Sequence, residues 1–202
     1  MTTGRSRNPV AVSVEPIARL AAIACGWWLL VISGFTFVEI VGRKLFGFSL
    51  QGVDEVSGYT LAVVSGVGFS YALVMRAHTR IDFLIVKLGP SPRAVLNVAA
   101  MVTLALMAIF ILWKGVPILL ESIEFKSRST SPLQTPMWIP QGLWIAGLAL
   151  FAAVASAFGL HAVWLLVRQD HTAIEHFYGP PSLDEEIDRE VDALKVRGKA
   201  DP

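Results

Sequence analysis

The chain has 202 residues, of which 54% are hydrophobic and only 16% are charged, whereas about 25% of the residues in ordinary soluble domains are charged. The net charge of +1 argues against nucleic-acid binding, and the single cysteine, Cys25, excludes an internal disulfide. Lys, Arg, Asp and Glu are absent from four long segments, which are residues 20–38, 56–75, 94–113 and 129–167. Because about 20 apolar helical residues cross the ~30 Å hydrocarbon core of a bilayer, this composition predicts an integral membrane protein.

The uncharged segments predict an all-α membrane protein with four transmembrane helices. Proline marks the helix ends, because it removes a backbone hydrogen bond and clashes with the preceding turn. The third helix is therefore expected to end before Pro117, and the fourth to begin near Pro140, after Pro132 and Pro136. The predicted helices cover residues 17–41, 56–75, 93–113 (or 93–115) and 140–168. The predicted regions are a cytoplasmic N-terminal arm of residues 1–16, a four-helix transmembrane domain of residues 17–168 and a cytoplasmic tail of residues 169–202.

Lysine and arginine are distributed unevenly along the chain. Twelve of the 17 lie in the N-terminal segment, the second connection and the tail, and five lie in the first and third connections. Because positively charged loops tend to stay in the cytoplasm, both termini are predicted to be cytoplasmic. Trp113, Trp138 and Trp144 then lie near the outer interface, where tryptophan is enriched.

The first connection carries its basic residues before its acidic ones. A turn at Gly47 and Gly52 would fold Asp54 and Glu55 back onto Arg43. Such an ion pair would stabilise the connection. The alternative is that these charges bind a partner.

Glu39 is the one acidic residue in the sequence that falls inside a predicted span. Ionisable residues inside a membrane are a functional hypothesis by default. Arg43, however, follows one helical turn later, so we expect an ion pair between positions i and i+4 at the membrane interface.

The second connection and the tail each predict a short amphipathic helix. In the second connection, apolar residues follow the i, i+3, i+4, i+7 spacing of a helix lying in the inner interface, and His78, Arg80 and Asp82 precede or start it. One histidine and one aspartate are too few to hold a metal ion. In the tail, Ser182 and Glu185 form a capping box before an apolar face, which predicts a cytoplasmic amphipathic helix.

Small residues recur at every fourth position in two of the predicted helices. The stripe in the second helix consists of Gly58, Ala62, Gly66 and Ser70, and that in the fourth of Ala149, Ala153 and Ala157. Small residues let helices approach closely in lipid. The stripes indicate either packing within the four-helix unit or docking onto another membrane subunit.

The predicted spans lack the groups that catalysis or transport needs. They contain no pair of charges, no nucleophile beside a base and no cluster of metal ligands, and the last three offer only His161, Asn97 and scattered hydroxyls. Pathways for ions or anionic substrates normally need polar groups or broken helices at mid-membrane. The sequence therefore predicts no catalytic residue, no metal site and no cofactor, and indicates a membrane subunit that works with a partner.

Together these motifs resemble the small permease (Q, or DctQ) subunit of tripartite ATP-independent periplasmic (TRAP) transporters. The resemblance rests on Arg43, on Asp54 and Glu55 at the head of the small-residue helix, on residues 78–82 (His-Thr-Arg-Ile-Asp), and on residues 131–140 before the last helix. It covers about residues 18–168. The chain departs from the family pattern just before the acidic pair, where it has Gly52 and Val53 instead of a tryptophan.

The resemblance implies partners and a location. In such a transporter a large permease (M) subunit carries the sodium and substrate sites and moves as an elevator. A periplasmic binding protein delivers the solute, typically a carboxylate, and the small subunit enlarges the static scaffold. The implied setting is a bacterial or archaeal inner membrane, with sodium-dependent uptake and no enzymatic activity in this chain. The motif positions implied to be structural or to contact the partner are Arg43, Asp54, Glu55, His78, Arg80 and Asp82.

Two alternatives come from other functional classes. A four-helix b-type cytochrome would use His78 and His161 as haem ligands from facing helices. A small self-assembling, proton-coupled exporter would use Glu39. A haem absorption band would identify the first, and solute movement without a second subunit would identify the other.

Overall fold

A computed structural model describes residues 8–76, 89–179 and 191 of the protein, and this part of the chain is almost entirely helical. Four of the helices are long and apolar enough to cross a membrane, which confirms the prediction of an all-α protein with four candidate spans. The elements are α1 (Pro9–Val41), a π-helical turn η1 (Gly42–Phe46), α2 (Val53–Val74), α3 (Pro90–Glu124), α4 (Trp138–Val167) and α5 (His171–Tyr178).

Three of the long helices, α1, α2 and α3, are longer than the uncharged segments within them, and the helix ends differ from the predicted ones. α1 begins at Pro9, inside the segment predicted as an arm, because Pro9 suits the first helical position and the Asn8 side chain accepts a hydrogen bond from the Val10 amide at 3.0 Å. α4 begins at Trp138, so Pro140 lies in the first turn, where its missing amide hydrogen has no partner to lose.

The prediction that the third helix ends before Pro117 is wrong, because α3 continues through that proline to Glu124. The proline removes one backbone hydrogen bond from a helix of 35 residues. Packing continues on both sides of it. Gly115 lies against Ile145 of α4, and Ser122 beyond the proline is buried. Tertiary contact therefore outweighs the local preference.

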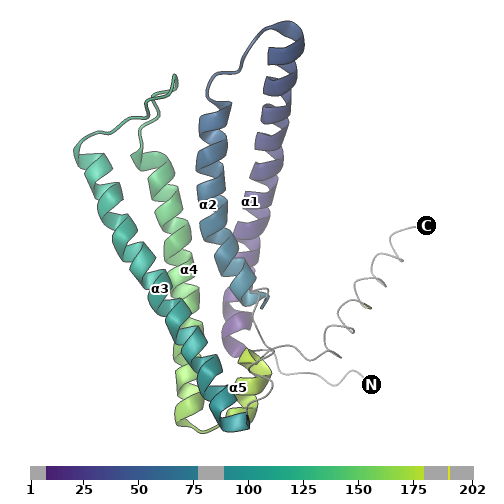
Figure 1. The fold of residues 1–202 in the computed structure, drawn as a ribbon, viewed down its shortest axis with the longest axis vertical. Coiled ribbons are helices and arrows are strands. Elements are labelled where there is room, and N and C mark those ends of the chain that lie inside the picture. The colour runs from purple at the N-terminus through teal and green to yellow at the C-terminus, as the bar shows by residue number, and fades with distance from the viewer. Residues whose placement is uncertain (1–7, 77–88, 180–190, 192–202) are drawn as a thin grey trace.

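The four long helices form an open row instead of a closed bundle (Figure 1). From one edge to the other the order is α3, α4, α2 and α1, with close contacts between neighbours in the row and a smaller contact between α1 and α4. Within the described residues, α3 has no close backbone contact with α1 or α2. Large apolar side chains are consequently exposed along the row, including Trp27, Phe37 and Leu106. Lipid or another protein must cover them in the membrane.

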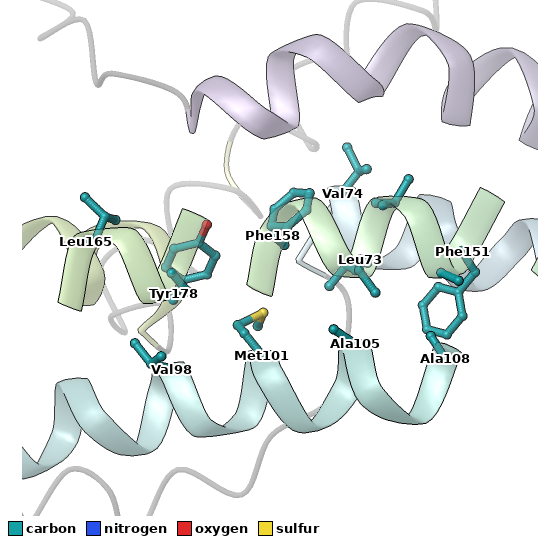
Figure 2. Packing of buried hydrophobic residues seen from close by; sticks show 14 of the residues in the cluster. Leu73, Val74, Val98, Met101, Ala105, Ala108, Phe151, Phe158, Leu165 and Tyr178 are labelled. Carbon is teal, nitrogen blue, oxygen red and sulfur yellow. The ribbon is translucent and has the colours of Figure 1, made fainter. Parts of the chain in front are cut away.

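The densest packing lies toward the end of the row that carries α5 (Figure 2). Figure 2 shows Val98 and Met101 of α3 pointing toward α4, with Tyr178 of α5 beside them, and Phe158 and Leu165 of α4 belong to the same cluster. Ile174 and Tyr178 of α5 are both buried. The short helix α5 therefore closes the end of the core that the long helices leave open.

Polar contacts fix α5 against the ends of the long helices. Arg76, which follows α2, donates hydrogen bonds to the carbonyl oxygens of His176 (3.2 Å) and Gly179 (2.6 Å). Arg93 of α3 forms an ion pair with Glu175 at 2.5 Å. Burial raises the pKa of Tyr178 to about 12, so its hydroxyl stays neutral.

Candidate functional site

The two connections that the structure describes in full, residues 42–52 and 125–137, lie at the end of the row opposite α5 (Figure 1). They contain, or directly adjoin, most of the motif residues on which the sequence analysis depends. Their contacts therefore decide whether those residues form one site.

Glu39 organises the first connection. Its carboxylate is 3% exposed and accepts hydrogen bonds from Arg43 (Nη2 at 2.8 Å), from the Ser49 hydroxyl (2.7 Å) and from the Leu50 amide. The ion pair expected between Glu39 and Arg43 is confirmed. With both carboxylate oxygens engaged, Glu39 holds the end of α1 and the following turn in one shape.

The pairing expected between Arg43 and the acids that follow it does not form. Arg43 uses Glu39, one turn earlier on the same helical segment, because an i,i+4 pair needs no loop closure. Asp54 is exposed, and Glu55 turns toward the other connection.

Glu55 joins the two connections. It accepts hydrogen bonds from the Tyr59 hydroxyl at 2.7 Å and from the Ser131 hydroxyl. Leu133 from the same connection packs over Gly52, where any side chain atom would overlap it. Gly52 also has φ +94°, a conformation that other residues rarely adopt. At Gly52, next to the place where the family pattern has a tryptophan, this chain thus has a close contact between the two connections.

The second of these connections is itself held by backbone hydrogen bonds. Arg128 and Pro136 form an isolated antiparallel bridge, the Ser129 amide donates to Thr135 at 2.9 Å, and the Met137 amide donates to Ser127 at 3.0 Å. The connection is therefore a compact hairpin, and the motif at residues 131–140 and the acid at position 55 form one structural unit.

His78, Arg80 and Asp82 lie outside the described residues, as do the two amphipathic helices predicted for the second connection and the tail. Sequence reasoning did not identify Ser131 and Leu133 as the partners of Glu55 and Gly52. Each of these pairs is separated by more than 70 positions in the chain, and no pattern in the sequence predicts that such residues are neighbours.

The structure divides the small-residue stripe of α2 into two halves. Gly66 and Ser70 are buried, and an added Cβ at Gly66 would lie 3.3 Å from the backbone of Gly147 in α4. Gly58 and Ala62 are exposed. Residues four apart in a helix with 3.6 residues per turn advance by about 40° per step, so the stripe winds away from α4 along α2.

Two of the three alanines in the α4 stripe, Ala149 and Ala153, face outward and Ala157 is half-buried, while Gly147, Phe151 and Ala155 make the inward contacts. Ala149 and Ala153 are exposed, as is Ala146 on the same side of the helix. The middle of α4 therefore presents a smooth surface of small residues, against which the backbone of another helix can pack closely.

Polar groups inside the candidate spans serve the contacts between helices. The Trp28 indole nitrogen donates to the Thr60 hydroxyl at 2.9 Å, which joins α1 to α2. His161 of α4 shares a hydrogen bond of 2.7 Å with the Tyr178 hydroxyl, and its ring stacks on Trp164 at a centroid distance of 5.9 Å. His161 thus helps to hold α5 against α4. The cytochrome alternative would instead use this side chain as a haem ligand.

An apolar cavity of about 380 Å³ lies between α1, α2 and the start of α4, but its chemistry does not suit an anionic solute. Its polar lining includes Thr60 and Tyr59, whose hydroxyls already bond Trp28 and Glu55. The part of the chain that the structure describes also contains no group of three acidic, histidine or cysteine side chains that could hold a metal ion. The arrangement is suited to rigid contact with other proteins and lipid.

Comparison with known proteins agrees with this geometry. Residues 32–160 match the family model described as the DctQ component of tripartite ATP-independent periplasmic transporters. A relative from Halomonas elongata, the ectoine TRAP transporter small permease protein TeaB, is 26% identical over 144 residues, which cover 68% of this chain and 74% of the relative.

Proposed function

Because this chain belongs to the DctQ family of TRAP transporter small permease components, a family without enzymatic activity, we propose that it is the static scaffold of a sodium-dependent uptake system. The large permease subunit carries the solute and the sodium ions and moves against this scaffold. A periplasmic binding protein delivers the solute. The complex resides in the cytoplasmic membrane of a bacterium or archaeon.

The open row of helices is the observation that carries this proposal. A protein that moved a solute by itself would need a polar path enclosed by its own helices. Here each long helix contacts its neighbours in the row and leaves broad apolar faces exposed. A row of helices with broad apolar faces is suited to pack beside another membrane protein and to widen its scaffold in the plane of the bilayer.

The exposed face of α4 is the surface that we propose to contact the large subunit. It carries Ala146, Ala149 and Ala153 in its middle, all of them exposed. Helices associate in lipid through van der Waals packing of small residues, because lipid tails remove any hydrophobic driving force between them. The adjacent connections, tied together by Glu55 and Ser131, extend the same contact beyond the bilayer.

We propose an organic carboxylate as the solute class. The relative from Halomonas elongata is named for ectoine, and the specificity of this system belongs to the binding protein and the large subunit. Among the described residues of this chain, the spans offer no cationic site at mid-membrane that would select an anion.

Reconstitution tests the scaffold role. The chain alone in proteoliposomes should show no sodium-dependent uptake, and uptake should appear when the large subunit and the binding protein are added. Ala153→Phe should reduce co-purification with the large subunit, because a bulky ring holds the helices apart. Leu30→Phe, at an exposed position of α1 where the side chain is already large and which lies outside the proposed α4 face, is the matched control and should leave co-purification unchanged.

Sodium-driven uptake by this chain alone would refute the accessory role. Equal co-purification of the two variants would leave the subunit assignment intact and refute only the α4 contact.

A further inference from the structure

A small basic pocket lies where α3 ends and α4 begins. It encloses about 370 Å³. Two cationic side chains and one hydroxyl line part of it, and apolar groups line the rest. The lining residues are Ile123, Lys126, Ser127, Arg128, Pro136 and Trp138.

The backbone around this pocket is held by hydrogen bonds on both sides. The Ser127 amide donates to the Ser122 carbonyl at 3.0 Å, and the Ser127 carbonyl accepts from the Met137 amide at 3.0 Å. The bridge between Arg128 and Pro136 closes the far side. The two cationic residues therefore project from a fixed hairpin, so the pocket is formed in advance of binding.

Carboxylates adjoin the pocket, but none of those described pairs with its two cations. Glu55 accepts a hydrogen bond from Ser131 of the same hairpin. Within the described chain, neither Lys126 nor Arg128 forms an ion pair. Glu121 and Glu124 lie in the last turns of α3, but neither lines the pocket. Two cations beside a hydroxyl donor form a favourable site for a phosphate group.

The apolar surface of the membrane helices reaches the edge of this pocket. Ile118, Leu120 and Ile123 are each about half exposed along the outer part of α3, and Trp138 is 51% exposed at the start of α4. Tryptophan at such a position marks the level of lipid headgroups. The pocket thus has the polarity gradient of a phospholipid, with a charged end and an apolar wall.

We propose that this pocket binds the phosphate of an anionic phospholipid. Lys126 and Arg128 hold the phosphate oxygens, and the Ser127 hydroxyl donates a further hydrogen bond. Ile123 and Trp138 contact the glycerol and the first acyl carbons. An acidic protein surface would use the cations but not the apolar wall. The pocket lies on the connection that the scaffold proposal places beside the large subunit, so the site is tested on this chain alone.

Lipid titration of the purified full chain tests the site. In neutral detergent, native mass spectrometry would measure binding of phosphatidylglycerol, phosphatidylcholine and inorganic phosphate. We expect tighter binding of phosphatidylglycerol than of phosphatidylcholine. The double variant Lys126→Gln/Arg128→Gln should weaken phosphatidylglycerol binding by about tenfold or more, since it removes both charge-assisted hydrogen bonds to the phosphate.

Two further variants make the result specific. Lys44→Gln/Lys114→Gln removes the same charge from exposed positions at the same end of the protein, outside the pocket, and should bind phosphatidylglycerol as the parent does. Lys126→Arg/Arg128→Lys keeps both charges and should also retain binding. The site is refuted if the two glutamine pairs lose binding equally or if phosphatidylcholine binds as well as phosphatidylglycerol. Displacement of the lipid by millimolar inorganic phosphate would assign the pocket to free phosphate and overturn the lipid proposal.

Discussion

At the scale of single residues, three positions are unusually important for the packing of this protein. Gly66 and Gly147 bring the backbones of α2 and α4 into direct contact, so each would place a Cβ about 3.3 Å from the other helix. Glu39 places a carboxylate at the end of α1, where three donors satisfy it. Glu39, which in the sequence raises the hypothesis of a functional site, thus stabilises the turn after α1.

Gly66→Leu should insert into the membrane but lower the stability of the protein. The leucine remains apolar, yet its bulk must push α4 away and lose the van der Waals contact that holds the helices together. Overpacking of this kind typically costs about 1–3 kcal/mol. The melting temperature of the purified chain measures the effect.

Gly68→Leu is the matched control, because nothing lies within 4 Å of a Cβ added there. It should melt within a degree or two of the parent. If the two variants melt alike, the contact between Gly66 and Gly147 does not hold α2 against α4.

At the scale of elements, the ends of the helices determine how the row is held. η1 turns the chain at one end, with Glu39 and Ser49 closing it. At the other end α5 folds back under the core, capped by the Asp170 side chain, which accepts from the Ala173 amide at 3.0 Å. The four long helices are long enough to cross a membrane, and the short elements η1 and α5 hold the ends of these helices in place.

Ile174→Ala should destabilise the docking of α5. Ile174 is fully buried against the core, and removing buried methyl groups from such a site costs about 2–5 kcal/mol. We expect a lower melting temperature and faster proteolysis after α4.

Thr172→Ala, two residues away on the opposite, exposed side of the same helix, should change neither quantity. Resistance of Ile174→Ala to both heat and protease would show that α5 is not part of the folded core.

At the scale of the whole molecule, the open row places the described start of the chain and α5 at one end, and the two joined connections at the other (Figure 1). Four spans require both termini to lie on the same side. Lysine and arginine are in excess in the N-terminal segment, the second connection and the tail, so we predict that both termini face the cytoplasm.

Reporter fusions check this orientation. A reporter fused after Pro202 should report a cytoplasmic location. A reporter inserted within residues 127–131 should report a location outside the cytoplasm. A fusion within residues 77–88 serves as the second cytoplasmic marker. Signals from the same side for the fusions at Pro202 and residues 127–131 would contradict the four-span arrangement.

The sequence by itself determined the number of candidate membrane spans, the family and the pair formed by Glu39 and Arg43. These features depend on composition, on short motifs and on an i,i+4 spacing, all of which are local. Proline was a poor guide to the helix ends, since contacts with α4 carry α3 past Pro117.

Only the tertiary structure decided how the helices are arranged. The order α3, α4, α2, α1, the docking of α5 and the bond between Glu55 and Ser131 each join residues far apart in the chain. The outward orientation of Ala149 and Ala153 in α4 is likewise decided by tertiary packing. In lipid every apolar face is equally acceptable, so hydrophobicity does not reveal which face packs inward, and close backbone contacts such as that between Gly66 and Gly147 decide it.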